Sequence, residues 1–360
     1  MENAREATAD RSQSLGAAAR VAVRFGAMAD NRVRVGGPYF EDLWHGQVFA
    51  DAPGVTLTPG HAALHQALSG DRLRLPLDHE LSAAVTGRAE PLAHPTLVCH
   101  VAIGQSTAPS QRVRGNLFYR GLRLLRPVHL GDTLRTRTEV VALRQNRPKP
   151  GRRPTGLAVL RVQVHNQRAE PVLDFWRCPM IPLRDPAADT GHADSFEDIP
   201  ADADPVEDLP WGWQLDAFAP TVTEPGTVYD IEVRDTVTSA PELARATLNL
   251  AATHTDPGAS AYRRRLVYGG HTISIAGAHA TRALPDLVTI VAWRSCEHTG
   301  PVFEGDVLRT ELRVEAVHQR DGYQLIDLRA VVHGCPALDA GDPAAAQLPV
   351  LDWRFVALAR

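Results

Sequence analysis

The chain has 360 residues, of which 44% are hydrophobic and 22% charged, and its formal net charge is −4. The length suits two units of ordinary size, and the hydrophobic content is enough for a real core. The near balance of charge argues against a partner that is a nucleic acid or an anionic membrane. No apolar run approaches the roughly 20 residues that span a bilayer, and no signal-peptide core is found, so we expect a cytoplasmic protein.

The first half of the chain is predicted to be one folded unit behind a flexible start. Residues 1–37 are rich in alanine and arginine and predict a flexible N-terminal extension. Residues 38–184 contain a threonine-rich helix start, a loop, and then an apolar helix that begins near Pro95. Several segments that alternate apolar residues with Arg, Thr and Glu follow, which predicts antiparallel strands with one wet face. A helix packed on such a sheet is an α+β unit.

The second half repeats this order. Residues 185–210, dense in Asp, Ala, Pro and Gly, are predicted to be a linker. In residues 211–360 a helix start again precedes an apolar helix near Gly270 and a run of alternating strands. We therefore expect two related α+β units in one chain.

Two segments of the first half recur in the second. They are PVHLGDTLRT (127–136), which recurs as PVFEGDVLRT (301–310), and PVLDFWR (171–177), which recurs as PVLDW (349–353). With the halves aligned on these segments, His254 corresponds to Pro76 and Gly269 to Pro95. Proline has neither a proton-transferring side chain nor a backbone N–H. The C-terminal unit is therefore predicted to be catalytic and the N-terminal unit to be degenerate.

Together with YFEDL (39–43) and phrases such as NLFYRGL and LVYGGHTISIA, these repeats resemble the MaoC-like hydratases. The resemblance covers most of residues 39–360 and is nearest to one double-hotdog branch, the mesaconyl-CoA hydratases (β-methylmalyl-CoA dehydratases). It implies a double hotdog fold, in which each of two repeats has a long central helix wrapped by a curved antiparallel sheet. It also implies a hydro-lyase that interconverts an enoyl-CoA and its 3-hydroxyacyl-CoA, with mesaconyl-CoA as the best match.

The resemblance also implies the site. The family uses an aspartate and a histidine five residues apart, with a backbone N–H at the start of the central helix. The matching positions hold Asn249, His254 and Gly269, with Gly270 next to it. Since asparagine cannot accept a proton, we expect His254 to transfer the proton and Asn249 to position water or substrate. The helix N-terminus would stabilise the enolate that forms when water adds to the thioester.

The acyl-CoA substrate needs partners for its phosphates and for any free carboxylate. Arg263, Arg264 and Arg265 lie between the histidine and the glycine pair, and we expect them to bind substrate. Asp71 matches the family aspartate in the N-terminal unit, but its partner position holds Pro76. We expect Asp71 to have a structural role or to line the substrate tunnel.

Two other functions stay open. Hotdog proteins include acyl-CoA thioesterases, although His271 and Thr272 stand here where a carboxylate would head the central helix. A non-catalytic acyl-CoA-binding protein is kept open by Asn249. We expect no cofactor, because coenzyme A is part of the substrate, and no metal, because His61 and His65 lack a third ligand. Further self-association into a homo-oligomer is expected.

Overall fold

The computed structural model describes residues 33, 35–200, 211–336 and 347–360. Most of the predicted N-terminal extension and residues 201–210 of the predicted linker lie outside the described residues. Gly37–Arg360 cluster as one compact unit. Within the described part of the chain, no helix has the length and apolar character that a membrane span requires.

The N-terminal half supplies four α-helices and six strands to the described structure. They are η1 (Phe40–Asp42), β1 (Val48–Phe49), β2 (Val55–Thr56), α1 (Pro59–Ser69), α2 (Arg74–Leu77), α3 (His79–Thr86), α4 (Pro95–Gln105), η2 (Ala108–Ser110), β3 (Gly115–Leu124), β4 (Thr133–Gln145), β5 (Thr155–His165) and β6 (Pro171–Pro182). The apolar helix begins at Pro95, as predicted.

The C-terminal half follows the same order. Its described elements are β7 (Val228–Thr236), α5 (Ala240–Ala246), η3 (Ala252–His254), α6 (Gly269–Ala283), β8 (Thr289–Glu297), β9 (Val307–Gln319), β10 (Gln324–Cys335) and β11 (Leu348–Ala359). The second apolar helix begins at Gly269, one residue before the predicted position.

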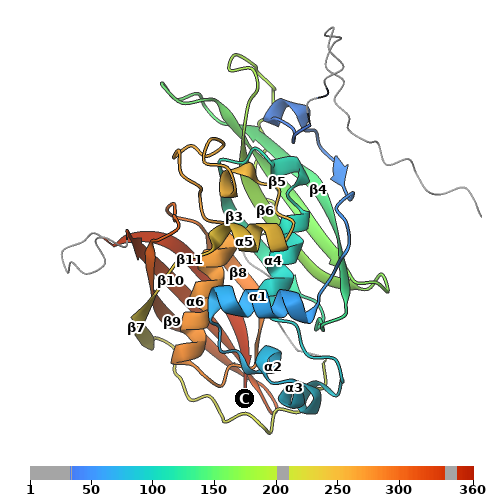
Figure 1. The fold of residues 1–360 in the computed structure, drawn as a ribbon, viewed down its shortest axis with the longest axis vertical. Coiled ribbons are helices and arrows are strands. Elements are labelled where there is room, and N and C mark those ends of the chain that lie inside the picture. Colours follow the sequence, from blue (N-terminus) through green and yellow to red (C-terminus); the bar gives the residue numbers. More distant parts are fainter. Residues whose placement is uncertain (1–32, 34, 201–210, 337–346) are drawn as a thin grey trace, which may run out of the picture. The chain divides into compact units, whose positions relative to one another are not determined.

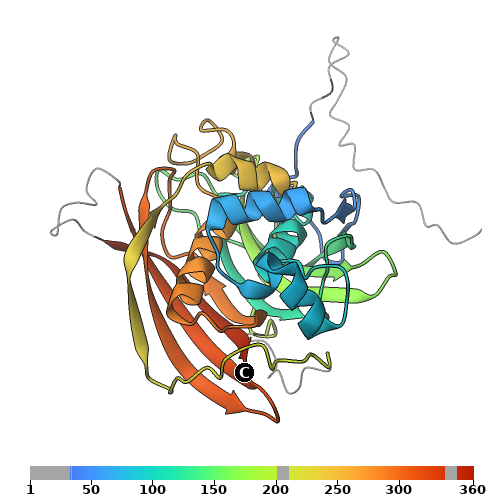
Figure 2. The ribbon, with the colours of Figure 1, turned by 60° about the horizontal axis from the view of Figure 1, so that its bottom comes forward.

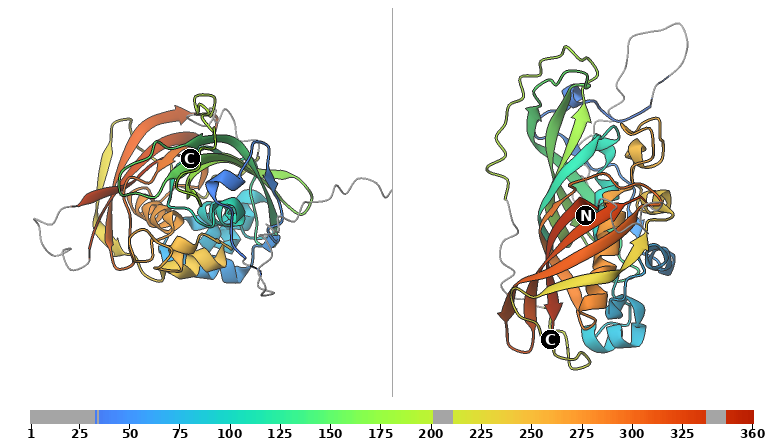
Figure 3. Two further views of the ribbon diagram at one scale, coloured as in Figure 1. Left: turned by 90° about the horizontal axis from the view of Figure 1, so that it is seen from above. Right: turned by 90° about the vertical axis from the view of Figure 1, so that its left-hand side faces the viewer.

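One antiparallel sheet joins the two halves. Its strand order is β1-β4-β5-β6-β3-β8-β11-β10-β9-β7, and β2 pairs with β4 off this path. The halves meet where β3 pairs with β8, with Tyr119 opposite Cys296. The sheet forms a curved layer with α4 and α6 on its concave side, and α1 and α5 lie beyond them, away from the sheet (Figures 1, 2 and 3). This is the predicted α+β arrangement of a helix wrapped by a curved sheet, present twice.

The two central helices cross at equivalent positions of the repeat. Residues of α4 are buried along its whole length, and α6 is buried from Gly270 to Thr281. His100 Nε2 lies 2.8 Å from Ser274 Oγ at the crossing. Gly104 permits a close approach nearby, because a Cβ there would overlap the backbone carbonyl of Thr247. The helices therefore make a shared centre for both halves.

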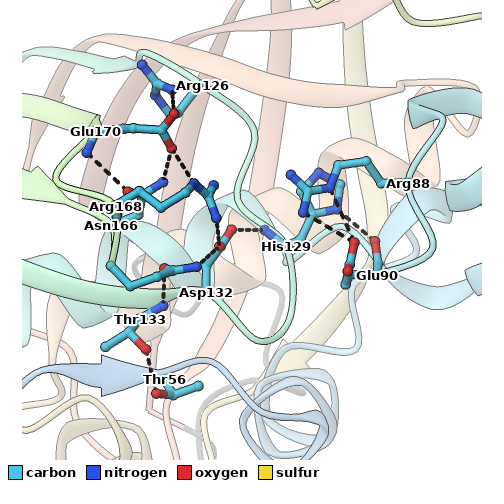
Figure 4. A network of polar contacts seen from close by, with 11 residues as sticks. Thr56, Arg88, Glu90, Arg126, His129, Asp132, Thr133, Asn166, Arg168 and Glu170 are labelled. Atoms are coloured by element: carbon cyan, nitrogen blue, oxygen red, sulfur yellow. Dashed lines mark hydrogen bonds and ion pairs between the residues drawn. The ribbon is translucent and has the colours of Figure 1, made fainter.

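The repeated Gly-Asp pair has a structural role. Gly131 and Gly305 have φ values of 97° and 93°, which favour glycine. The next residue closes the same turn in each half: Asp132 accepts a hydrogen bond from the His129 N–H (2.9 Å), and Asp306 accepts one from the Phe303 N–H (2.8 Å). Figure 4 shows Asp132 in a wider polar network on the N-terminal side. These turns lead directly into β4 and β9. The Gly-Asp pair that the two halves share therefore serves the fold and not the active site.

Candidate active site

A cavity of about 240 Å³ lies between the halves and is lined by residues of both. Three of the four residues predicted to be catalytic line it: Asn249, His254 and Gly269. Gly270 follows in the first turn of α6, but it faces Tyr268 and is not part of the cavity wall. The structure therefore brings the predicted histidine and the predicted helix start to one site.

The hydrogen bond made by His254 defines its proton-accepting nitrogen. Nδ1 lies 2.9 Å from the carbonyl oxygen of Leu266. Because a carbonyl can only accept, Nδ1 carries the proton and Nε2 is left with a free lone pair. Burial, together with the charge of Arg177, lowers the pKa of His254 to about 4. At neutral pH the imidazole is therefore uncharged and able to take a proton.

Asn249 is held by its own backbone turn. Its Oδ1 accepts a hydrogen bond from the Ala251 N–H (2.9 Å), and the residue is 9% exposed. The side-chain amide therefore has its two N–H donors left for a ligand or water. Asp and Glu are absent from the cavity wall that the described residues form. His254 is therefore a better candidate for the base than any carboxylate there.

The start of α6 needs glycine. A Cβ on Gly269 would lie within 3.0 Å of His298 Nε2, closer than real Cβ atoms approach. The first N–H groups of a helix have no intrahelical acceptor, and the helix dipole makes that end partly positive. The α6 N-terminus in the cavity wall is therefore suited to stabilise a negatively charged oxygen.

Four buried side-chain atoms in the cavity wall have no hydrogen-bond partner within the described chain. They are Asn116 Oδ1, Arg177 Nε, Tyr268 OH and His298 Nε2. Buried polar groups are usually satisfied, so four orphaned ones in one wall indicate a site for a polar ligand. Burial, followed by the neighbouring His254, lowers the pKa of His298 to about 4. None of these four residues was predicted from the sequence.

The arginines predicted to bind substrate lie outside the cavity wall. Arg263 is exposed, the guanidinium of Arg264 lies 4.2 Å from the centre of the Phe303 ring, and Arg265 forms an ion pair with Glu304 (2.7 Å). Arg264 and Arg265 therefore have separate partners, and none of the three lines the cavity.

Asp71, which was predicted to belong to the substrate-binding set or to have a structural role, is buried, contacts Thr281 of α6 and does not line the cavity. It is 2% exposed, its Oδ2 lies 3.3 Å from His94 Nε2, and its Oδ1 accepts from the Leu73 N–H (2.8 Å). The same short turn is made by Asn249, so the two residues are equivalent in the repeat. These contacts fit the structural role expected for Asp71 better than a place in the substrate-binding set.

The equivalent place in the N-terminal half is nearly closed. Only about 20 Å³ remains there, between the start of α4 at Pro95, the segment Pro127–Val128 and the rings of Trp211 and Trp213. Pro95 has no N–H to offer a ligand.

The two histidines of α1 have different hydrogen-bond partners. The His61 ring lies 2.8 Å from the Thr58 hydroxyl, and the His65 ring lies 3.1 Å from the Thr96 hydroxyl.

Comparisons with known proteins indicate the family and the fold. No family model matches the chain. The chain is 32% identical over 289 residues to a β-methylmalyl-CoA dehydratase of Chloroflexus aurantiacus, which covers 76% of this chain and 80% of that protein. It is 30% identical over 316 residues to a mesaconyl-CoA hydratase of Cereibacter sphaeroides, and the match covers 83% of this chain and 90% of that protein. A conserved hypothetical protein of Mycobacterium tuberculosis, described as a double hotdog essential for bacterial survival during infection, superposes with a TM-score of 0.85. It is 50% identical, over 91% of this chain and all of that one.

Proposed function

Because the chain belongs to the MaoC-like double-hotdog family of CoA-thioester hydratases and dehydratases, we propose that its cavity adds water to mesaconyl-CoA to give β-methylmalyl-CoA. The observation that carries this proposal is the shared cavity of His254 and the α6 N-terminus. A base with a free nitrogen and a set of unpaired N–H donors are the two groups that hydration of an enoyl thioester requires.

The reaction proceeds through an enolate. Water lies between the Asn249 amide and His254 Nε2, which takes one of its protons. The water oxygen bonds to C3 of the acyl chain, and the electrons of the C2–C3 double bond move towards the thioester carbonyl. The enolate oxygen accepts hydrogen bonds at the start of α6, where one such donor is worth roughly 3 to 4 kcal/mol. The proton then passes from His254 to C2, so the net change is the addition of one water.

The coenzyme A part of the substrate lies outside the small cavity. A volume of about 240 Å³ is below the roughly 300 to 1,000 Å³ of sites that enclose whole drug-sized ligands. The acyl end therefore occupies the cavity, and the phosphates lie towards Arg114 at its wall and the exposed loop of Arg263. No separate cofactor enters the proposal, because coenzyme A arrives with the substrate.

The test follows the C2–C3 double bond and the thioester bond of the substrate. We expect purified protein and mesaconyl-CoA to lose the absorbance of the enoyl thioester without releasing thiol. Thiol release would instead support the thioesterase alternative. If neither signal is observed, the alternative of a non-catalytic acyl-CoA-binding protein remains.

His254→Ala should lower the hydration rate by about 10² to 10⁴-fold, the usual contribution of a general base. His61→Ala is the matched control, because His61 lies at the start of α1 and outside the cavity wall. Equal rates for the two variants would remove His254 from the mechanism.

A further inference from the structure

Among the described residues, Arg177 is a buried cation without an anionic partner. It lies on β6, is 4% exposed, and lines the cavity. Its Nη2 donates a hydrogen bond to Ser110 Oγ, while its Nε has no partner. No carboxylate of the described residues pairs with it. Leaving a charge buried and unpaired costs several kcal/mol, so such a group is usually matched by an opposite charge.

Other arginines of the same sheet do have carboxylate partners. Arg161 pairs with Asp174 (2.8 Å), and Arg294 pairs with Asp327 (2.9 Å). Both are more exposed than Arg177, so the most deeply buried of the three is the one without a carboxylate. This contrast indicates that the partner of Arg177 is not part of the described chain.

The repeat shows that the fold does not need an arginine at this position. Phe355 occupies the equivalent position in the C-terminal half, where it is fully buried and stacks on Trp353 with ring centroids 4.0 Å apart. The cation therefore occurs only in the copy of the strand that faces the open cavity. A requirement of the site explains this difference better than a requirement of folding.

Arg177 is also close to the proposed chemistry. It is opposite Tyr119 in the pairing of β6 with β3, and both residues line the cavity. Its positive charge acts on His254, whose pKa it helps to lower. In mesaconyl-CoA the free carboxylate is attached to C3, the carbon that receives the water oxygen. A carboxylate held by Arg177 would therefore keep C3 near His254.

We propose that Arg177 binds the free carboxylate of the acyl group and selects enoyl-CoA substrates derived from dicarboxylic acids. This rests on the proposed function for the place of the acyl chain in the cavity. The planar guanidinium forms bidentate hydrogen bonds with carboxylates, which fixes orientation as well as charge. The bound carboxylate also satisfies the orphaned Nε and offsets the charge that acts on His254.

The kinetic test uses a matched pair of substrates. Mesaconyl-CoA is compared with (E)-2-methylbut-2-enoyl-CoA, in which a methyl group replaces the carboxylate. We expect wild-type protein to prefer mesaconyl-CoA by at least about 100-fold in kcat/KM, and Arg177→Gln to remove most of that preference. Arg177→Lys should restore part of it. Equal losses on both substrates, or no preference in the wild type, would overturn the proposal.

A binding test separates this inference from hydration itself. The saturated esters methylsuccinyl-CoA and 2-methylbutyryl-CoA cannot be hydrated and differ by the same carboxylate. By calorimetry, Arg177→Gln should weaken the first at least about 10-fold and leave the second within about 2-fold, which also shows that the variant is folded. Arg161→Gln, on a paired arginine outside the cavity wall, is the control.

The two proposals can then fail separately. Discrimination in binding without any hydration would leave Arg177 as a carboxylate site and remove the hydratase. Hydration of mesaconyl-CoA with no discrimination between the paired esters in either assay would support the hydratase and remove Arg177 as a carboxylate site. Equal weakening of both saturated esters would assign Arg177 to the coenzyme or to folding, and would overturn the inference.

Discussion

Gly269→Ala tests whether the start of α6 stabilises the enolate. The added Cβ would lie within 3.0 Å of His298 Cε1 and Nε2, so either the ring or the first turn of the helix must move. A displacement near 1 Å at reacting groups can cost about 100-fold in rate. Full loss of one oxyanion donor costs about 10² to 10³-fold in kcat. We therefore expect kcat for hydration to fall by about 100 to 1,000-fold.

The matched control is a glycine at the start of another helix. Gly60 is in the first turn of α1, and the nearest atom to its added Cβ would be Thr58 Oγ1 at 3.5 Å, an ordinary contact. Gly60→Ala should keep kcat and should not lower the thermal midpoint, since alanine is the better helix residue. Thermal unfolding of both variants shows that they are folded. A kcat for Gly269→Ala within about 3-fold of wild type would refute a role for this helix start.

Two further predictions concern pH. Since burial holds the pKa of His254 near 4, the acid limb of kcat/KM should fall near pH 4, whereas a limb near 6.5 would indicate a different base. Stability should be full above pH 6.5 and should decline below it, because burial lowers the pKa of His65, of His100 (to about 3) and of His271 (to about 4), while the unfolded chain takes protons near 6.5. Between pH 8 and pH 5.5 each such histidine should lower the free energy of unfolding by roughly 1 kcal/mol, and equal free energies of unfolding in denaturant titrations at the two pH values would contradict this.

The alternation that predicted antiparallel strands is clear in some strands and absent at the junction of the halves. β4 and β9 alternate apolar and polar residues because one face of each is wet. β8 (Thr289–Glu297) is buried on both faces over its first five residues, so it has no such alternation. β3 also lacks a clean period. Periodicity alone therefore does not predict the two strands that join the halves.

The site divides in the same way. Asn249, His254 and Gly269 lie close together in the chain. The repeat marked His254 and Gly269 because prolines stand at the equivalent positions, and the family resemblance marked Asn249. Arg177 and His298 reach the cavity from β6 and from the end of β8, so their proximity depends on long-range strand pairing. The alignment of the two halves did contain a signal for them, because Arg177 is aligned with Phe355 and His298 with Leu124. Mismatches between the repeats were thus informative beyond the loop that carries the histidine.

The predicted arginine cluster had no comparable support. Arg264 and Arg265 have partners in Phe303 and Glu304, which are close to them only in the folded chain. A run of like charges in a loop gives no information on which side chain faces a cavity. Burial without a partner, which only the structure could show, distinguished Arg177 instead.

The origin of the oxygen atom in the product tests the central claim most directly. Wild-type protein and mesaconyl-CoA are incubated in ¹⁸O-labelled water, and the CoA ester is analysed by mass spectrometry. Water addition predicts one ¹⁸O in the acyl chain of an intact thioester, with no free coenzyme A. An unlabelled ester, or a label found only in a released acid beside free thiol, would contradict it.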